Sequence, residues 1–271
     1  DITFNYTLDA DSPGGQELEL FSGTDGDITF VGNVGAGARL GDVFIGDDNA
    51  GDQHDFQSIL ASGTFAANSL SVEQFADDGG EVRFDQGINT AGYTAAAIAN
   101  SEAGGDVFID TDADADGDPG GDVLVFGTIN TSALAVTSGP GEDAGNVTID
   151  GKDVVVQGIQ AIGGETTDGG EDGGAGGAVD IDALDALVST PLITLTGSAS
   201  AFEINTTGGA PGAGGAQGAG GDVTIGDNAT PGGGADFIRI TADDYGITTG
   251  PTDGNIAFQG FLDDNNQSLT L

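Results

Sequence analysis

A five-residue phrase of the form Gly-Asp-Val-x-Ile recurs nine times, with variations, in the 271 residues of the chain. In residues 221–225, glycine and aspartate favour a turn, and valine and isoleucine then point to the same face of a strand. The apolar part of the other copies begins at Ile28, Val43, Val82, Val107, Val123, Val147, Val179 and Ile256. An internal repeat of short strands indicates a solenoid, in which each coil buries its apolar face against its neighbours.

Two further strand phrases alternate with this repeat. An Ile-Asn-Thr type occurs at 88–90, 129–131, 204–206 and, as Ile-Thr-Thr, at 247–249. A type with alternating apolar residues occurs at 134–136, 154–156, 192–195 and 237–240. In the second half of the chain the three phrases follow one another in a fixed order and then repeat. The order predicts an all-β fold, a right-handed parallel β-helix with three sides, formed by residues 1–271 as a single domain.

Glycine-rich segments interrupt this order at one corner of the expected coil. Residues 163–181 and 207–225 are each 19 residues long, and both end in the strand phrase. A solenoid tolerates such insertions because only a loop lengthens. With 51 glycines helix is expected to be scarce, and the best helical candidates are residues 180–187 and 93–100. The alternative fold is an antiparallel β-sandwich whose Asp-Gly pairs close two-residue hairpins.

The charge of the chain excludes several functions. It contains 45 acidic and 4 basic side chains, for a net charge of −41. Nucleic acid and anionic membrane surfaces would be repelled, and no apolar run approaches the length of a membrane span. Such charge destabilises a compact chain unless ions screen it, so a salty or calcium-containing medium is expected. A solvated acidic surface without special adaptation is the other interpretation.

The strand phrases also resemble a known family. Residues 192–195, 204–206 and 208–225, and less completely 134–136 and 144–149, are similar to the repeats of filamentous haemagglutinin-type exoproteins, the secreted partners of two-partner secretion systems, and of related giant adhesins. The resemblance implies a right-handed β-helix that is secreted and has an adhesive or structural role at the cell surface. Cell-surface glycans or proteins are then the expected partners.

One acidic loop is a candidate calcium site. Asp112, Asp114, Asp116 and Asp118 alternate with small residues around Gly117. Hard oxygen ligands at alternate positions followed by glycine match the start of an EF-type loop, although its closing glutamate is absent. A solvated acidic loop without metal is the alternative, so calcium is the one cofactor that the sequence suggests.

Catalytic patterns are few. The chain has no cysteine and one histidine, His54, which argues against a nucleophilic triad. The natural enzymatic alternative is a carbohydrate-active β-helix enzyme, but four basic residues are few for binding acidic sugars. We therefore expect a protein without enzymatic activity.

Both ends of the sequence have strand character. Ile2 and Phe4 alternate with polar residues at one end, and Leu269 and Leu271 do so at the other. Uncapped solenoid ends expose apolar side chains and unpaired backbone groups. The sequence is then either a segment of a longer solenoid or a subunit that associates head to tail through these four residues.

Overall fold

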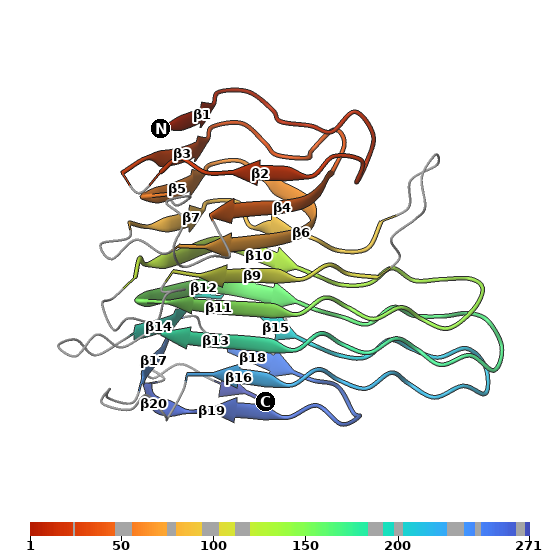
Figure 1. Ribbon diagram of the computed structural model, residues 1–271. Helices are drawn as coiled ribbons and strands as arrows, with labels where there is room; N and C mark the ends of the chain where they lie inside the picture. The colour runs from red at the N-terminus through yellow and green to blue at the C-terminus, as the bar shows by residue number, and fades with distance from the viewer. Residues whose placement is uncertain are drawn as a thin grey trace.

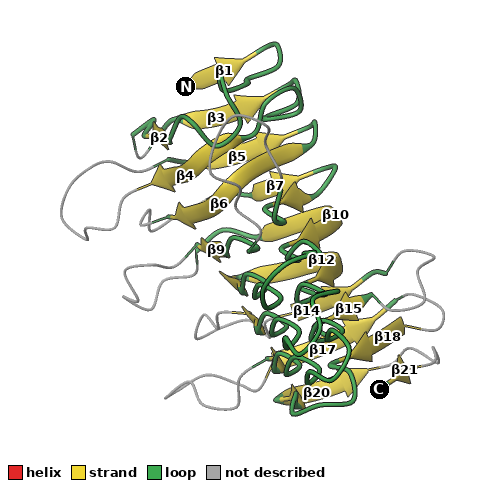
Figure 2. Ribbon diagram, turned by 90° about the vertical axis from the view of Figure 1, so that its right-hand side faces the viewer, coloured by secondary structure: helices red, strands yellow, loops and turns green. Residues whose placement is uncertain are grey.

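The computed structural model describes residues 1–23, 25–46, 56–74, 80–93, 103–111, 120–183, 192–197, 203–226, 236–241, 245–263 and 269–271. The regular structure in these residues consists of strands, with no helix among them (Figures 1 and 2). Each pairing between these strands is parallel, which confirms the predicted all-β parallel arrangement. The antiparallel sandwich is therefore wrong.

The strands form three parallel stacks, which the chain visits in the same order in each coil (Figure 1). The first stack consists of β1 (Ile2–Phe4), β3 (Asp27–Phe30), β5 (Ser58–Ala61), β7 (Val82–Phe84), the starts of β10 (Val123–Asn130) and β12 (Asp153–Gln160), β14 (Leu192–Leu195), β17 (Asp236–Ile240) and β20 (Gly260–Asp263). The second stack consists of the start of β6 (Phe65–Glu73), β8 (Ile88–Asn89), the ends of β10 and β12, β15 (Ile204–Asn205), β18 (Tyr245–Thr248) and β21 (Leu269–Thr270). The third stack consists of β2 (Leu18–Leu20), β4 (Leu40–Gly46), the end of β6, β9 (Val107–Asp110), β11 (Val147–Gly151), β13 (Val179–Ala183), β16 (Val223–Ile225) and β19 (Ile256–Phe258).

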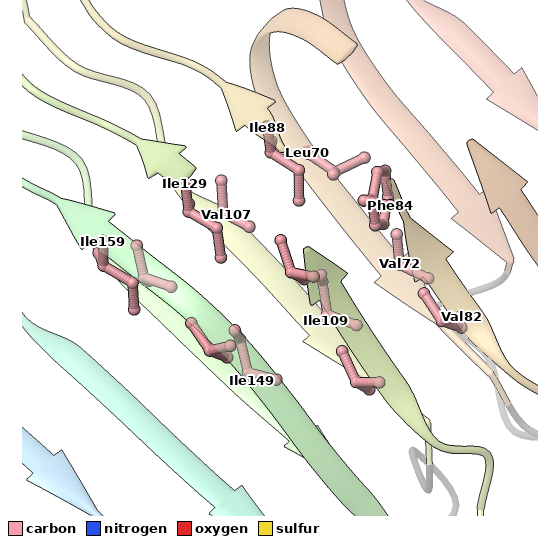
Figure 3. Packing of buried hydrophobic residues seen from close by; sticks show 14 of the residues in the cluster. Leu70, Val72, Val82, Phe84, Ile88, Val107, Ile109, Ile129, Ile149 and Ile159 are labelled. Atoms are coloured by element: carbon pink, nitrogen blue, oxygen red, sulfur yellow. The ribbon is translucent and has the colours of Figure 1, made fainter. Parts of the chain in front are cut away.

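The hydrophobic core lies between the three stacks. Val82 and Phe84 of the first stack, Ile88 of the second, and Val107 and Ile109 of the third point into the same interior (Figure 3). Each of these side chains is at most 1 % exposed. Because the pairing keeps equivalent residues in register from coil to coil, one inward residue lies on another along the whole stack.

Aromatic rings fill the core in the amino-terminal coils. The ring of Phe65 meets the rings of Phe30 and Phe84 edge to face, with centroids 5.6 Å apart in both pairs. Edge-to-face contacts of this kind add about 0.5–1.5 kcal/mol to the burial of the rings. Phenylalanine therefore supplies the volume that tryptophan and methionine, absent from the chain, would otherwise give.

The repeat phrase does not mark a single side of the coil. Six of its nine copies lie in the third stack, but those at Ile28, Val82 and Val123 lie in the first. The prediction that the phrase defines one strand class is therefore wrong. The physical reason is that a turn followed by two inward β-branched residues suits the entrance to a strand at either corner.

The Ile-Asn-Thr phrase, in contrast, marks one corner. Ile88, Ile129, Ile204 and Ile247 are all buried in the second stack, as the fixed order predicted. The asparagine that follows accepts a hydrogen bond at 3.1 Å from the backbone N–H two residues later, at Asn89, Asn130 and Asn205. This local bond turns the chain out of the strand.

The threonine of the same phrase closes the coil. Thr206 is fully buried, and its Oγ1 donates to the carbonyl of Gly221 at 2.7 Å, while the Gly221 N–H donates to the carbonyl of Thr206 at 2.9 Å. Thr131 and Gly145 form the same two bonds at 2.7 and 2.9 Å. We call this pair of bonds the threonine clamp. It joins the start of the third-stack strand to the end of the second-stack strand, whatever lies between them.

Between the second and third stacks the chain forms long arms, at residues 131–145, 161–177 and 206–221, which lie one below another (Figure 1). The first and last of these arms are closed by the threonine clamp, and the middle one by the backbone bond from Gly177 N to Ala161 O alone. Backbone groups join neighbouring arms, as in the bonds from Gly163 N to Thr207 O at 2.9 Å and from Gly173 N to Ala216 O at 3.0 Å. The glycine-rich insertions are therefore ordered by backbone hydrogen bonds, which the sequence alone did not indicate.

Glycine is required inside the arms by close backbone packing. The outgoing and returning halves of an arm meet directly, with Gly174 N donating to Gly164 O at 2.9 Å. A Cβ at Gly174 would lie 1.8 Å from the carbonyl oxygen of Glu142, and one at Gly209 would lie 1.9 Å from that of Gly164. Neighbouring arms thus pack backbone against backbone at these positions, with no room for a side chain.

Two further predictions on local structure are wrong. Residues 134–136 form no strand, and Val136 makes only an isolated bridge to Thr166. Residues 180–183, predicted to begin a helix, belong to β13, because Val179 and Ile181 fill the core alongside Val223 and Ile225. Residues 184–187 and 94–100 lie outside the described residues.

Candidate functional site

The first coil presents an incompletely buried apolar surface. Strand β1 pairs with β3 on one side, and no other described strand pairs with it. Ile2, Phe4 and Leu8 point inward but are only partly buried. Ile28, which pairs with Ile2 in the next coil, is fully buried. The ring of Phe4 stacks on that of Phe30, with centroids 5.1 Å apart and planes 5° from parallel. The structure thus brings together the predicted association residues Ile2 and Phe4 at this surface.

The last coil presents a similar surface at the opposite end (Figure 1). Leu262 occupies the inward position aligned with Ile238, yet 43 % of its surface is exposed, compared with none for Ile238. Leu271 is 68 % exposed, and Leu269 is partly buried below Tyr245. The predicted residues Leu269 and Leu271 therefore do lie together, at the opposite surface from Ile2 and Phe4. Leu262 was missed because its phrase, Gly-Phe-Leu-Asp, resembles none of the repeats.

Carboxylates bind the corners of neighbouring coils. Oδ1 of Asp106 accepts from the N–H of Asn146 at 2.7 Å, and Oδ1 of Asp222 accepts from the N–H of Asn255 at 2.8 Å. The carboxylates of Asp1, Asp143, Asp153 and Asp172 accept in the same way from Asp27, Ala175, Leu192 and Ala216. Part of the acidic composition therefore has a structural use, since a carboxylate satisfies a backbone donor at the corner.

Burial perturbs the pKa of one carboxyl group and one phenol in this part of the solenoid. Burial, and then repulsion from Asp122, raises the pKa of Asp153, while the N–H of Leu192 acts in the opposite direction. Burial also raises the pKa of the Tyr245 phenol, with a further contribution from Glu203. The Tyr245 hydroxyl is buried and has no hydrogen-bond partner. The phenol therefore stays protonated at neutral pH.

The candidate metal site cannot be placed. Asp112, Asp114, Asp116 and Asp118 lie outside the described residues, as does His54. The ends of the loop are described: Oγ1 of Thr111 donates to the carbonyl of Gly121 at 2.7 Å and closes its base. Within the described parts of the chain, no three or more acidic or histidine side chains are grouped so as to hold a metal ion. The predicted calcium site stays a prediction.

Comparison of the chain with protein-family models, with curated proteins and with solved structures gave no match. The described residues include no helix with the length and apolarity that crossing a membrane requires.

Proposed function

We propose that this chain is a non-enzymatic structural and adhesive protein of the cell surface, a right-handed three-sided β-helix that forms a fibre by stacking its end coils on those of a second copy. The observation that carries the proposal is the pair of apolar end surfaces. At both ends, inward positions whose counterparts in the interior coils are buried are only partly buried.

The two end surfaces both combine apolar side chains with strand edges. At the carboxyl-terminal end the third stack presents Ile256 and Phe258, and at the amino-terminal end it presents Leu18. In both terminal strands, β19 and β2, side chains alternate between inward and outward positions, as they do in the interior coils. The outer edge of each of these strands carries backbone groups that can continue a parallel ladder. A coil placed on either end would thus bury apolar side chains and pair free strand edges together.

Charge sets the conditions for such assembly. Each copy carries a net charge of −41, so two copies repel each other at low ionic strength. Salt shortens this repulsion to about 8 Å at physiological ionic strength. End-to-end association is therefore expected to strengthen as salt or calcium is added, in keeping with an extracellular location.

Electron microscopy and light scattering across salt and calcium concentrations test the proposal. We expect rods that lengthen in whole multiples of the single molecule. Leu262→Asp should abolish the lengthening by placing a charge in the stacked interior. Val31→Asp changes a side chain that is 51 % exposed and is the matched control, which should assemble normally. Single particles under all conditions, or equal assembly of the two variants, would refute end-to-end stacking.

A further inference from the structure

A groove of about 520 Å³ runs over the outer face of the second stack and crosses the second to fifth coils. Small residues line it, among them Gly35, Ala66 and Gly87. Asn89, aligned with Ala66, and Asn130, aligned with Asn89, continue the same row. The groove therefore follows the coil axis, since its lining residues come from aligned positions of successive coils.

Arg39 lies at the side of this groove. Its guanidinium donates to the carbonyl of Ala91, and to both the carbonyl and the Oδ1 of Asn89 at 3.1 and 3.0 Å. It also lies over the ring of Tyr93, 5.0 Å from the centroid. No carboxylate of the described residues pairs with Arg39. Burial lowers the pKa of Arg39, because removal from water disfavours the charged guanidinium.

The amides in the groove add donors of fixed direction. Oδ1 of Asn89 and of Asn130 accepts the N–H of Ala91 and Ser132, both at 3.1 Å, so the Nδ2 groups remain as donors. No described residue accepts a hydrogen bond from either Nδ2 group. The two asparagines belong to neighbouring coils, about 4.8 Å apart. The groove thus offers one cation and repeated neutral donors, which suits a ligand that is rich in acceptors and negatively charged.

We infer that this groove binds an acidic saccharide chain, with the Arg39 guanidinium on a sugar carboxylate and the Asn89 and Asn130 amides on neighbouring oxygens. Guanidinium and carboxylate are complementary in shape as well as charge, and the bond is roughly twice as strong as one between neutral groups. A sugar chain supplies hydroxyl and ring oxygens at regular intervals for the amides. The net negative charge of the protein opposes an anionic ligand, and this opposition weakens as salt is added.

This inference names a ligand for the adhesive role proposed above, but it can fail separately. A protein that forms fibres but does not bind the sugar would refute only the groove inference. A protein that binds the sugar but forms no fibres would refute only the proposed end-to-end stacking. Arg83 supplies the matched control, because it lies outside the groove and is held by Asp85 at 2.6 Å and Glu81 at 3.6 Å.

Calorimetric titration with oligogalacturonate, at physiological ionic strength, tests the inference. The methyl-esterified oligosaccharide keeps the sugar ring and removes the charge, and a sulfated galactan keeps a charge and removes the carboxylate. We expect the native protein to bind oligogalacturonate, Arg39→Gln to bind it about tenfold more weakly or worse, and Arg83→Gln to bind it normally. Ala66→Leu should also block binding by filling the groove, without changing a charge.

Four results would overturn the inference: no binding by the native protein, equal binding of the methyl ester, equal binding of the sulfated galactan, or equal losses for the two arginine variants. Thermal unfolding of each variant separates lost binding from lost structure. If Arg39→Gln loosens the segment around Ala91, Ala66→Leu still decides the outcome.

Discussion

The threonine clamp makes the strongest quantitative prediction. Replacing Thr206 with valine keeps the volume and the β-branch but removes the hydroxyl that donates to Gly221 O at 2.7 Å. Thr206 is fully buried, so water cannot replace the lost donor. Leaving a buried carbonyl without its partner costs about 1–3 kcal/mol. Thr206→Val is therefore expected to destabilise this coil by that amount.

Hydrogen exchange at the Gly221 amide measures the effect locally, since a solenoid need not unfold in one step. The amide donates to the carbonyl of Thr206 at 2.9 Å, so it becomes free when the clamp opens. A loss of about 1–3 kcal/mol corresponds to exchange that is about fivefold to a hundredfold faster. Exchange at Gly145, in the clamp of another coil, should stay unchanged.

The chain contains a natural comparison. Ala161 occupies the place of Thr206 in the middle arm, and the backbone bond from Gly177 N to Ala161 O, 2.9 Å long, is made without a hydroxyl. Ala161→Thr should slow exchange at Gly177 relative to Ala161→Val, which adds similar bulk without the donor. The reasoning is refuted if the Gly221 amide of Thr206→Val exchanges as slowly as in the native protein and the Gly177 amide of Ala161→Thr exchanges as fast as in Ala161→Val.

Three other predictions concern the arms and the buried polar groups. Gly174→Ala places a Cβ 1.8 Å from a backbone oxygen and should cost about 1–3 kcal/mol or more in urea unfolding, whereas Gly169→Ala, whose Cβ meets its nearest atom at 3.9 Å, should cost less than about 1 kcal/mol. Asp153→Asn should raise the melting temperature near neutral pH. Because folding raises the pKa of the Asp153 carboxyl, its contribution to stability is complete below the pKa of the unfolded state and declines as the pH rises through the pKa of the folded state. The gain from Asp153→Asn should therefore vanish in acid, and a gain that is equal at all pH values would contradict this assignment. Tyr245→Phe removes a buried hydroxyl that has no partner and should leave the free energy of unfolding unchanged or raise it by about 1 kcal/mol, while a clear loss would reveal a bond to that hydroxyl.

The periodic apolar pattern was enough to predict most of the strands and their parallel stacking, with the errors at 134–136 and 260–263 noted above. It succeeds because inward residues such as Ile204 and Val223 are spaced by the pleat and must be buried in every coil. The Ile-Asn-Thr phrase predicted a specific corner because its asparagine and threonine make bonds that only that corner needs. The Gly-Asp phrase predicted a strand entrance but not its side, because both entrances accept the same turn.

The remaining features depend on contacts between residues far apart in the sequence. The ordering of the arms rests on backbone bonds between residues about 45 positions apart, such as the bond from Gly163 N to Thr207 O, and glycine-rich composition alone is equally typical of an unstructured loop. The position of Arg39 in a groove depends on Asn89 and Ala91, about 50 residues further on. A lone basic residue in an acidic sequence carries no signal of such neighbours.

The threonine clamp also makes the arms replaceable. Thr249 and Gly254 form the side-chain bond at 3.1 Å across a separation of 5 residues, whereas Thr206 and Gly221 form it across 15. Coil closure is thus indifferent to what is inserted, and doubling the length of a loop costs only about 0.6 kcal/mol. Peptides or whole domains grafted between these two residues would be displayed in a row along one edge, at intervals of one coil. The same property lets arms lengthen or shorten during evolution while the coils that carry them stay unchanged.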